Sequence, residues 1–122
     1  WQMPQGGVDQ NEGFLQAAKR ELAEETGIKS IRLIKELDGW FKYDLPEYLL
    51  GKLWEGKYKG QKQKWFVMKF LGKPNEINVK TKNPEFFDWK WINLSKLPEI
   101  AVHFKVDIYK KIKEQLTSLR LN

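Results

Sequence analysis

Four glutamates and one arginine stand at fixed distances between two turn glycines, in the stretch from Gly6 to Ile28. We expect Phe14 to Thr26 to be helical, because the segment holds mostly good helix formers and no proline. Glu21, Glu24 and Glu25 then share one helix face, since their spacing is i, i+3 and i+4. Three like charges at this spacing repel one another, so stability alone does not account for the cluster.

A divalent cation would remove that repulsion. A ligand set made only of oxygen atoms points to Mg²⁺ or Mn²⁺ rather than zinc, and Mg²⁺ binds through a few carboxylates together with substrate phosphates. The alternative is an acidic, solvated helix face, which is what most Glu-rich helices are.

The spacing of defined residues extends over the whole stretch. It reads Gly6, five residues, Glu12, seven residues, Arg20-Glu21, the aliphatic Leu22, one residue, Glu24-Glu25, one residue, Gly27 and the aliphatic Ile28. This pattern resembles the Nudix box at every defined position. So many residues in register favour a functional site over a merely solvated face.

Outside the box, the chain is similar to one branch of the Nudix superfamily, the RNA pyrophosphohydrolases and the asymmetric dinucleoside tetraphosphate hydrolases. The matching segments are Trp1–Gly7, Gly60–Phe66, Asn83–Phe86 with Trp89 and Trp91, and Phe104-Lys105 ahead of Tyr109. The resemblance implies an α/β (α+β) fold, the Nudix α/β/α sandwich with a mixed sheet. It also implies strands ahead of Trp1, so we expect the chain to be N-terminally incomplete.

Composition favours one globular domain over residues 1–122. Hydrophobic residues make up 41% and charged residues 31%, which excludes a disordered chain, and no apolar run is long enough to cross a membrane. The absence of cysteine excludes disulfides and a thiol nucleophile and agrees with a cytoplasmic location. Lys and Arg exceed Asp and Glu by 22 − 16 = 6, which suits a polyanionic ligand. We expect a monomer.

Periodicity and turn residues predict the remaining elements. The helix should begin near Glu12 or Gly13 with Asn11 as its cap, bury Leu15, Ala18 and Leu22, and end at Gly27. Strands are expected at Ser30–Leu37, with a slip at Ile34, and at Trp40–Leu45, Gln63–Leu71 (central and buried on both faces), Ile77–Val79 and Phe86–Ile92, with Trp89 and Trp91 in the core. The C-terminal helix should bury Val106, Tyr109, Ile112, Leu116 and Leu119, with Lys105 outside this stripe.

The resemblance assigns roles around the box. Glu21, Glu24 and Glu25 would bind Mg²⁺, or Mn²⁺ in its place, helped by the Gly6 carbonyl and by Glu85. Water attacks phosphorus directly, and a carboxylate takes its proton. Glu25 and Glu85 are the candidates for this base, with Glu24 also in the catalytic set, and the sequence does not choose between Glu25 and Glu85.

Two further groups follow from the same resemblance. Arg20 and Glu12 would orient the loop and helix through an ion pair, although Glu12 could equally be a plain carboxylate at a helix start. The candidate substrate contacts are Tyr43, Gln61, Lys64, Val102, Phe104 and Lys105. Phe104 could instead be a core residue. His103, the sole histidine, receives no catalytic role.

Three functions are carried forward. The first is Mg²⁺-dependent hydrolysis of 5′-triphosphate or 5′-diphosphate RNA ends to 5′-monophosphates. The second is hydrolysis of diadenosine tetraphosphate and related dinucleoside polyphosphates. The third, from another class, is a non-catalytic Nudix module that only binds RNA, and the intact acidic triad disfavours it because a pure binder of a polyanion does not need those charges.

Overall fold

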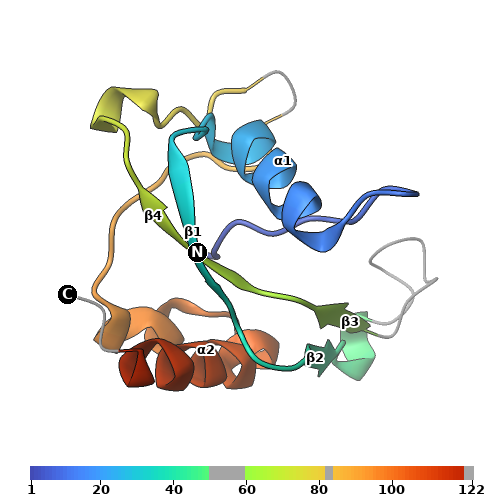
Figure 1. The fold of residues 1–122 in the computed structure, drawn as a ribbon. Coiled ribbons are helices and arrows are strands. Elements are labelled where there is room, and N and C mark those ends of the chain that lie inside the picture. The colour runs from blue at the N-terminus through green and yellow to red at the C-terminus, as the bar shows by residue number, and fades with distance from the viewer. Residues whose placement is uncertain (50–59, 82–83, 120–122) are drawn as a thin grey trace. The chain divides into compact units, whose positions relative to one another are not determined.

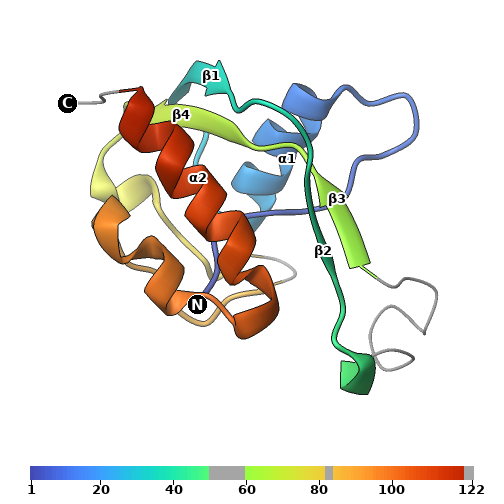
Figure 2. The same ribbon diagram turned by 90° about the horizontal axis from the view of Figure 1, so that it is seen from below.

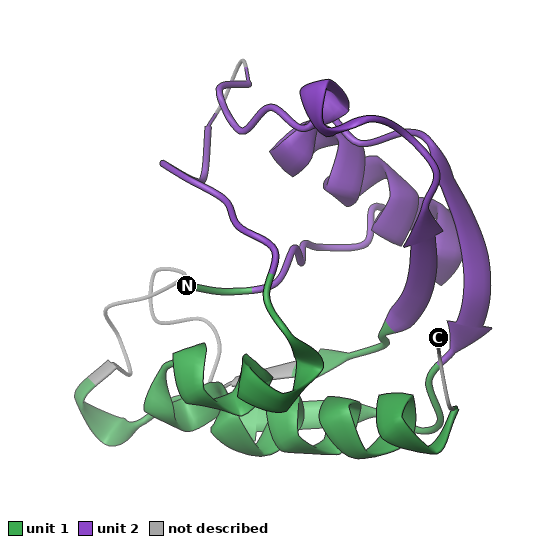
Figure 3. Cartoon of the chain, turned by 90° about the vertical axis from the view of Figure 1, so that its left-hand side faces the viewer, with its two compact units in different colours: residues 1–2, 37–65, 92–122 green, residues 3–36, 66–91 purple. Residues whose placement is uncertain are grey.

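The computed structural model describes residues 1–49, 60–81 and 84–119. The chain forms two compact units, each assembled from segments that are distant in sequence (Figure 3). Unit 1 comprises residues 1–2, 37–65 and 92–122, and unit 2 comprises residues 3–36 and 66–91. Asn83, in one of the segments that resemble the family, lies outside the described residues.

The helix of the box is α1 (Phe14–Thr26), in unit 2 (Figure 1). It ends as predicted at Gly27, which adopts a left-handed φ of 75° and donates its N–H to the Ala23 carbonyl at 2.9 Å. Its N-cap is Gly13, so the prediction of Asn11 as cap is wrong. Asn11 instead takes a φ of 64° in the preceding turn, a conformation that asparagine tolerates better than most residues.

The buried face of α1 differs from the predicted aliphatic stripe. The fully buried residues of the helix are Ala17, Glu25 and Thr26. The three residues predicted for the stripe are only half-buried: Leu15, Ala18 and Leu22. The helix therefore places a carboxylate in its buried face.

Two antiparallel strands complete the regular structure described in unit 2. β1 (Ile31–Glu36) pairs with β4 (Phe66–Phe70). The register shifts between Leu33 and Lys35, so Ile34 is the extra residue of a β-bulge. The break in alternation at Ile34 therefore has a structural cause, and the prediction of a strand here is confirmed.

The strand predicted over Gln63–Leu71 is divided in two. Gln63 closes β3 (Gly60–Gln63), Lys64 and Trp65 follow, and β4 begins at Phe66. In the described part of the chain β4 pairs only with β1, and its side chains are half-buried or exposed. The prediction of a central strand buried on both faces is not met there.

A short 3-10 helix, η3 (Pro74–Glu76), ties the end of α1 to the start of β1. The Glu76 carboxylate accepts the backbone N–H groups of Lys29 at 2.7 Å and Ser30 at 2.8 Å. The pKa of Glu76 is lowered first by a side-chain hydrogen bond from Ser30 and then by these two backbone hydrogen bonds. The connection between helix and strand is thus held by one side chain from a distant loop.

The strands predicted at Ile77–Val79 and Phe86–Ile92 are absent from the described residues. The Asn78 N–H bonds to the Thr26 carbonyl at the end of α1, at 2.7 Å, instead of to a neighbouring strand. Backbone groups that are satisfied in this way have no need of a sheet partner.

The tryptophan side chains of the segment Phe86–Ile92 lie near the surface. Trp89 is 37% exposed and Trp91 66% exposed, so their prediction as core residues is wrong. They pack edge to face against each other at 6.4 Å, and Trp91 lies 5.9 Å from the Phe70 ring. With no strand partner for the segment, these rings cover one another instead of entering a core.

In unit 1, β2 (Phe41–Asp44) pairs antiparallel with β3, as Figure 2 shows. Gly39, with φ 78°, makes the turn that leads into β2. Alternation sends Phe41 and Tyr43 to the buried face of the ladder. The strand predicted over Trp40–Leu45 is confirmed.

The 3-10 helix η1 (Glu47–Leu49) follows β2. Two further 3-10 helices, η4 (Leu94–Ile100) and η5 (His103–Lys105), precede the C-terminal helix α2 (Val106–Ser118). Its buried residues are Ile108, Tyr109 and Ile112, so two of the five predicted stripe residues are fully buried and Ile108 joins them. Val106, Leu116 and Leu119 are half-buried.

The described residues combine helices with two small antiparallel sheets, β1-β4 and β2-β3. The mixed α and β content is as predicted, whereas a mixed sheet is not seen in the described ranges, because both pairs are antiparallel. Within those ranges no helix has the length and apolar character needed to cross a membrane.

Candidate functional site

Arg20, on α1, is the centre of an ion-pair network in unit 2. Its Nε donates to Glu12 Oε2 at 2.7 Å and its Nη2 to Glu12 Oε1 at 2.9 Å, a two-point contact. Nη1 reaches Glu21 at 2.9 Å and Glu24 at 3.2 Å, and Nη2 also donates to the Gly7 carbonyl at 2.8 Å. One guanidinium therefore joins the loop before the helix to two glutamates of the box.

Glu12 is fixed from both sides. Besides its contact with Arg20, Glu12 Oε1 accepts the Asp9 N–H at 3.0 Å. These contacts lower its pKa to about 2, with the hydrogen bond from Arg20 the largest cause. The predicted ion pair between Arg20 and Glu12 is present, and its geometry joins loop to helix.

The loop backbone passes very close to α1 at Gly6. A Cβ atom added there would overlap the carboxylate of Glu21. Only glycine lets the backbone approach this carboxylate so closely while Glu21 keeps its contact with Arg20. The Gly6 backbone and the Glu21 carboxylate, two of the predicted ligands, are therefore neighbours.

Glu25 is the most unusual side chain of the box, because it is only 3% exposed. Its Oε2 accepts the Gln5 N–H at 3.2 Å, and its Oε1 is buried without a hydrogen-bond partner. The pKa of Glu25 is raised to about 8, first by burial and then by the neighbouring carboxylates of Glu85 and Glu21. A buried acceptor of this kind requires either a proton or a cation.

Glu85, from the distant loop 84–91, lies close enough to Glu25 to raise the pKa of that carboxyl. Glu21 and Glu24 are turned toward Arg20. In the described ranges, no three His, Cys, Asp or Glu side chains already converge as a set of metal ligands. The donors nevertheless fit a hard divalent cation, because they are all oxygens and one of them, Glu25 Oε1, is buried and unsatisfied.

A second cluster of predicted residues lies in unit 1. The rings of Tyr43 and Phe104 are 5.4 Å apart, and the Lys105 ammonium lies 5.6 Å from the Tyr43 ring centroid and 6.0 Å from that of Phe104. Lys105 Nζ also donates to Gln2 Oε1 at 3.3 Å. This is a cation held among aromatic rings.

Lys105 was expected outside the apolar stripe, yet it is only 8% exposed. The difference arises because it belongs to η5, one residue before α2, and its chain lies along the rings of Tyr43 and Phe104. Burial lowers its pKa. Phe104 itself is half-buried, between the two roles considered for it.

The other predicted substrate contacts are also in unit 1. Lys64 Nζ donates to the Gly39 carbonyl at 3.2 Å, Val102 is exposed, and Gln61 pairs with Tyr43 across the β2-β3 ladder. His103 Nε2 lies 3.0 Å from the Tyr48 hydroxyl, a contact between η1 and η5 that gives the histidine a structural partner.

Two glutamines next to the box were missed as site residues. Gln5 supplies the N–H that binds Glu25, and Gln2 supplies the oxygen that binds Lys105. The only signal for them was their position in the segment ahead of the box that matches the family.

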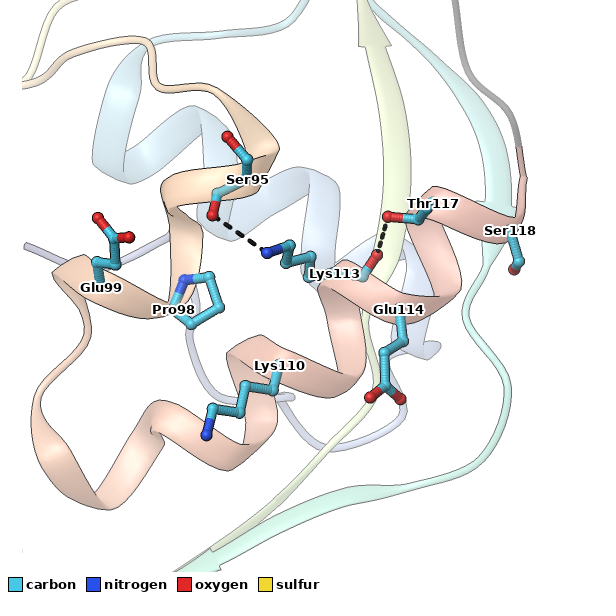
Figure 4. Close-up of a pocket in the computed structure, with 8 residues that line it drawn as sticks. All are labelled: Ser95, Pro98, Glu99, Lys110, Lys113, Glu114, Thr117 and Ser118. Atoms are coloured by element: carbon cyan, nitrogen blue, oxygen red, sulfur yellow. Dashed lines mark hydrogen bonds between the residues drawn. The ribbon is translucent and has the colours of Figure 1, made fainter.

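A shallow groove of about 630 Å³ lies between η4 and α2 (Figure 4). Lys113 donates to the Ser95 carbonyl across it at 3.2 Å. The lining residues are Ser95, Pro98, Glu99, Lys110, Lys113, Glu114, Thr117 and Ser118. None of the predicted site residues is among them.

Residues 1–112 match the model of the NUDIX domain. This chain belongs to the Nudix family. Curated relatives include a protein of Pelagibacter ubique named RNA pyrophosphohydrolase, 57% identical over 98% of this chain and 75% of that protein. Proteins of the same name from Bartonella bacilliformis and from Wolbachia of Culex pipiens are 46% and 47% identical, over 98% of this chain and 72% and 74% of their own lengths. The resemblance noted from the box is therefore confirmed.

Replacing Arg20 with lysine tests the network. A lysine keeps the charge but cannot make the two-point contact with Glu12 while reaching Glu21 and Glu24. We expect Arg20→Lys to weaken Mn²⁺ binding and lower kcat by about 10- to 100-fold, the usual effect of losing a group that orients metal ligands. Calorimetry and steady-state kinetics measure these quantities. Unchanged Mn²⁺ affinity and kcat would contradict an orienting role, and Lys19→Arg, on the same helix, is the control.

The buried Glu25 predicts a pH dependence of stability in metal-free protein. Its pKa of about 8 lies above the ordinary value of 4.5, so the folded state binds more protons than the unfolded state between these values. The contribution of Glu25 to the free energy of unfolding should therefore be largest below pH 4.5, and it should fall as the pH rises toward 8.

Urea denaturation in EDTA, at several pH values across this window, compares the wild type with Glu25→Gln. The amide does not titrate, so the variant should show a weaker decline. Glu12 does not interfere, because its lowered pKa affects the free energy of unfolding only below the ordinary value of 4.5. Parallel curves for the two proteins would contradict a buried, protonated Glu25.

Proposed function

We propose that this chain is an RNA pyrophosphohydrolase that converts 5′-triphosphate or 5′-diphosphate RNA ends to 5′-monophosphates by attack of water at phosphorus. The names of its relatives support this assignment, at identities of 43–57%. The structural observation that carries it is Glu25, a buried carboxyl with one unpartnered oxygen beside the carboxylates of Glu85 and Glu21.

The residues that would hold Mg²⁺, or Mn²⁺ in its place, are Glu21, Glu24, Glu25, Glu85 and the Gly6 carbonyl. When bound, the cation supplies charge neutralisation for the phosphates and acidifies a water molecule. Among these ligand atoms, Glu25 Oε1 would be stabilised most by a cation, because it is buried and accepts no hydrogen bond. Gln5 holds the other oxygen of Glu25 in place.

The proton of the attacking water passes to Glu25 or Glu85. Both are candidates, because the Glu85 carboxylate lies close enough to Glu25 to raise the pKa of Glu25 in the metal-free protein, and a base must lie within reach of the water. Glu85 is exposed and can return a proton to solvent. The two neighbouring carboxyls are therefore suited to take a proton from water and pass it out of the site.

Arg20 and Glu12 act as orienting residues, since their ion pair joins the loop of Gly6 to α1. Substrate contacts are assigned to Tyr43, Gln61, Lys64, Val102, Phe104 and Lys105. Support comes from Phe104, a half-buried ring that lies 5.4 Å from the ring of Tyr43 and 6.0 Å from the Lys105 ammonium.

The wider expectations are part of the same proposal. Residues 1–122 would form a single Nudix domain of the α/β/α sandwich type with a mixed sheet, supported by the match over residues 1–112. A cytoplasmic location agrees with the absence of cysteine from the sequence, and a monomer is part of the proposal.

The decisive assay gives the protein 5′-triphosphorylated RNA and diadenosine tetraphosphate in parallel, with Mg²⁺. We expect a higher kcat/KM for the RNA end, and Glu24→Gln should lower kcat by at least about 10²-fold, as for loss of major transition-state electrostatics. Glu99→Gln, a glutamate of η4 outside the candidate site, is the matched control and should leave kcat unchanged.

Each other result rejects part of the proposal. A preference for the dinucleotide would make the chain a dinucleoside polyphosphate hydrolase. Turnover of neither substrate, together with RNA binding that Glu24→Gln leaves unaltered, would make it a non-catalytic RNA-binding module.

A further inference from the structure

One face of the β2-β3 ladder in unit 1 carries an exposed tryptophan among lysines. The register pairs Lys42 with Lys62, and alternation places Trp40 and Lys64 on the same face, opposite to buried Phe41. Trp40 is 44% exposed, and Lys42 and Lys62 are exposed. We call Trp40, Lys42, Lys62 and Lys64 the Trp40 face.

Two of the three ammonium groups of this face lie close to the Trp40 ring. Lys62 Nζ lies 4.5 Å and Lys64 Nζ 4.7 Å from the Trp40 ring centroid, both within the range of cation–π attraction. Lys64 Nζ is also held by the Gly39 carbonyl. The indole therefore keeps two positive charges close together at the surface.

This arrangement does not serve the stability of the ladder. Like charges directly across two strands, as at Lys42 and Lys62, are destabilising. In the described part of the chain none of the three lysines forms an ion pair with a carboxylate. Asp44 shares their strand face but stands at its far end, opposite Gly60. The face therefore has a surplus of positive charge beside an accessible aromatic ring.

We propose that the Trp40 face binds the single-stranded body of the RNA whose 5′ end is hydrolysed, an inference that rests on the proposed function. Backbone phosphates contact the ammonium groups of Lys42, Lys62 and Lys64, and a base stacks on the exposed part of Trp40. Aromatic stacking combined with lysine contacts to phosphate is the general mode of binding to single strands, and it tolerates any sequence. A planar base next to a phosphate matches this face better than an acidic peptide, which offers charge without a ring.

The test compares two substrates that have the same 5′-triphosphate but differ in length, a dinucleotide and an unstructured RNA of about 20 nucleotides, a length that exceeds the site size of one small binding module. We expect Trp40→Ala and Lys62→Ala to lower kcat/KM about tenfold for the long RNA through KM, on the scale of one stacked base. The dinucleotide should be cleaved as by the wild type. Lys62→Ala should also reduce the salt slope for the long RNA by about 0.7.

Two variants serve as controls. Lys111→Ala removes an exposed lysine from α2 and should behave as the wild type on both substrates. Trp40→Phe keeps a ring for stacking and should retain most of the activity on the long RNA.

A second readout does not depend on catalysis. Fluorescence anisotropy with 5′-hydroxyl RNA measures binding of the RNA body alone, and Trp40→Ala should raise its Kd about tenfold. If the wild type cleaves neither substrate while Trp40→Ala raises this Kd, the proposed function is rejected and the Trp40 face is still supported.

Three results would overturn the inference. The first is an unchanged Kd for 5′-hydroxyl RNA in both Trp40→Ala and Lys62→Ala. The second is an equal loss of kcat/KM on the two substrates, which indicates a structural role. The third is displacement of the RNA by polyglutamate as efficient as by unlabelled RNA, which indicates a surface for anions in general.

Discussion

The candidate site depends on one physical constraint, a glutamate side chain held out of water. Glu25 is buried with one oxygen bound to a backbone N–H and the other without a partner. Two more carboxylates, of Glu85 and Glu21, lie close enough to raise its pKa. A folded protein tolerates such a group only if a proton or a cation balances it. The other charged residues of the box lie around this carboxyl and determine which positive partner it can have.

Arg20 supplies positive charge to the outer carboxylates of the box and not to Glu25. It contacts Glu12, Glu21 and Glu24, and it leaves Glu25 to other partners. Because the same guanidinium binds the Gly7 carbonyl, the position of the loop and the charge of the helix are coupled. The arginine thus organises the outer carboxylates, while the inner carboxyl is left for a proton or a metal ion.

The box was predictable because its signals are local. Gly27 ends the helix as its φ requires, and the slip at Ile34 became a bulge. Features set by distant contacts were not predictable. The Asn78 N–H bonds to the end of α1, Trp91 is exposed, and the side chain of Lys105 lies along two aromatic rings. Periodicity describes one segment at a time, so it cannot reveal which partner that segment finds.

Proton release on metal binding tests the central claim most directly. At pH 7 a group with a pKa of about 8 is mostly protonated, so it must lose its proton when a cation binds to its oxygens. Calorimetry of Mn²⁺ binding in two buffers with different ionisation enthalpies counts the protons released. We predict close to one proton for the wild type and about none for Glu25→Gln. Mn²⁺ binding to the wild type without proton release would contradict the account.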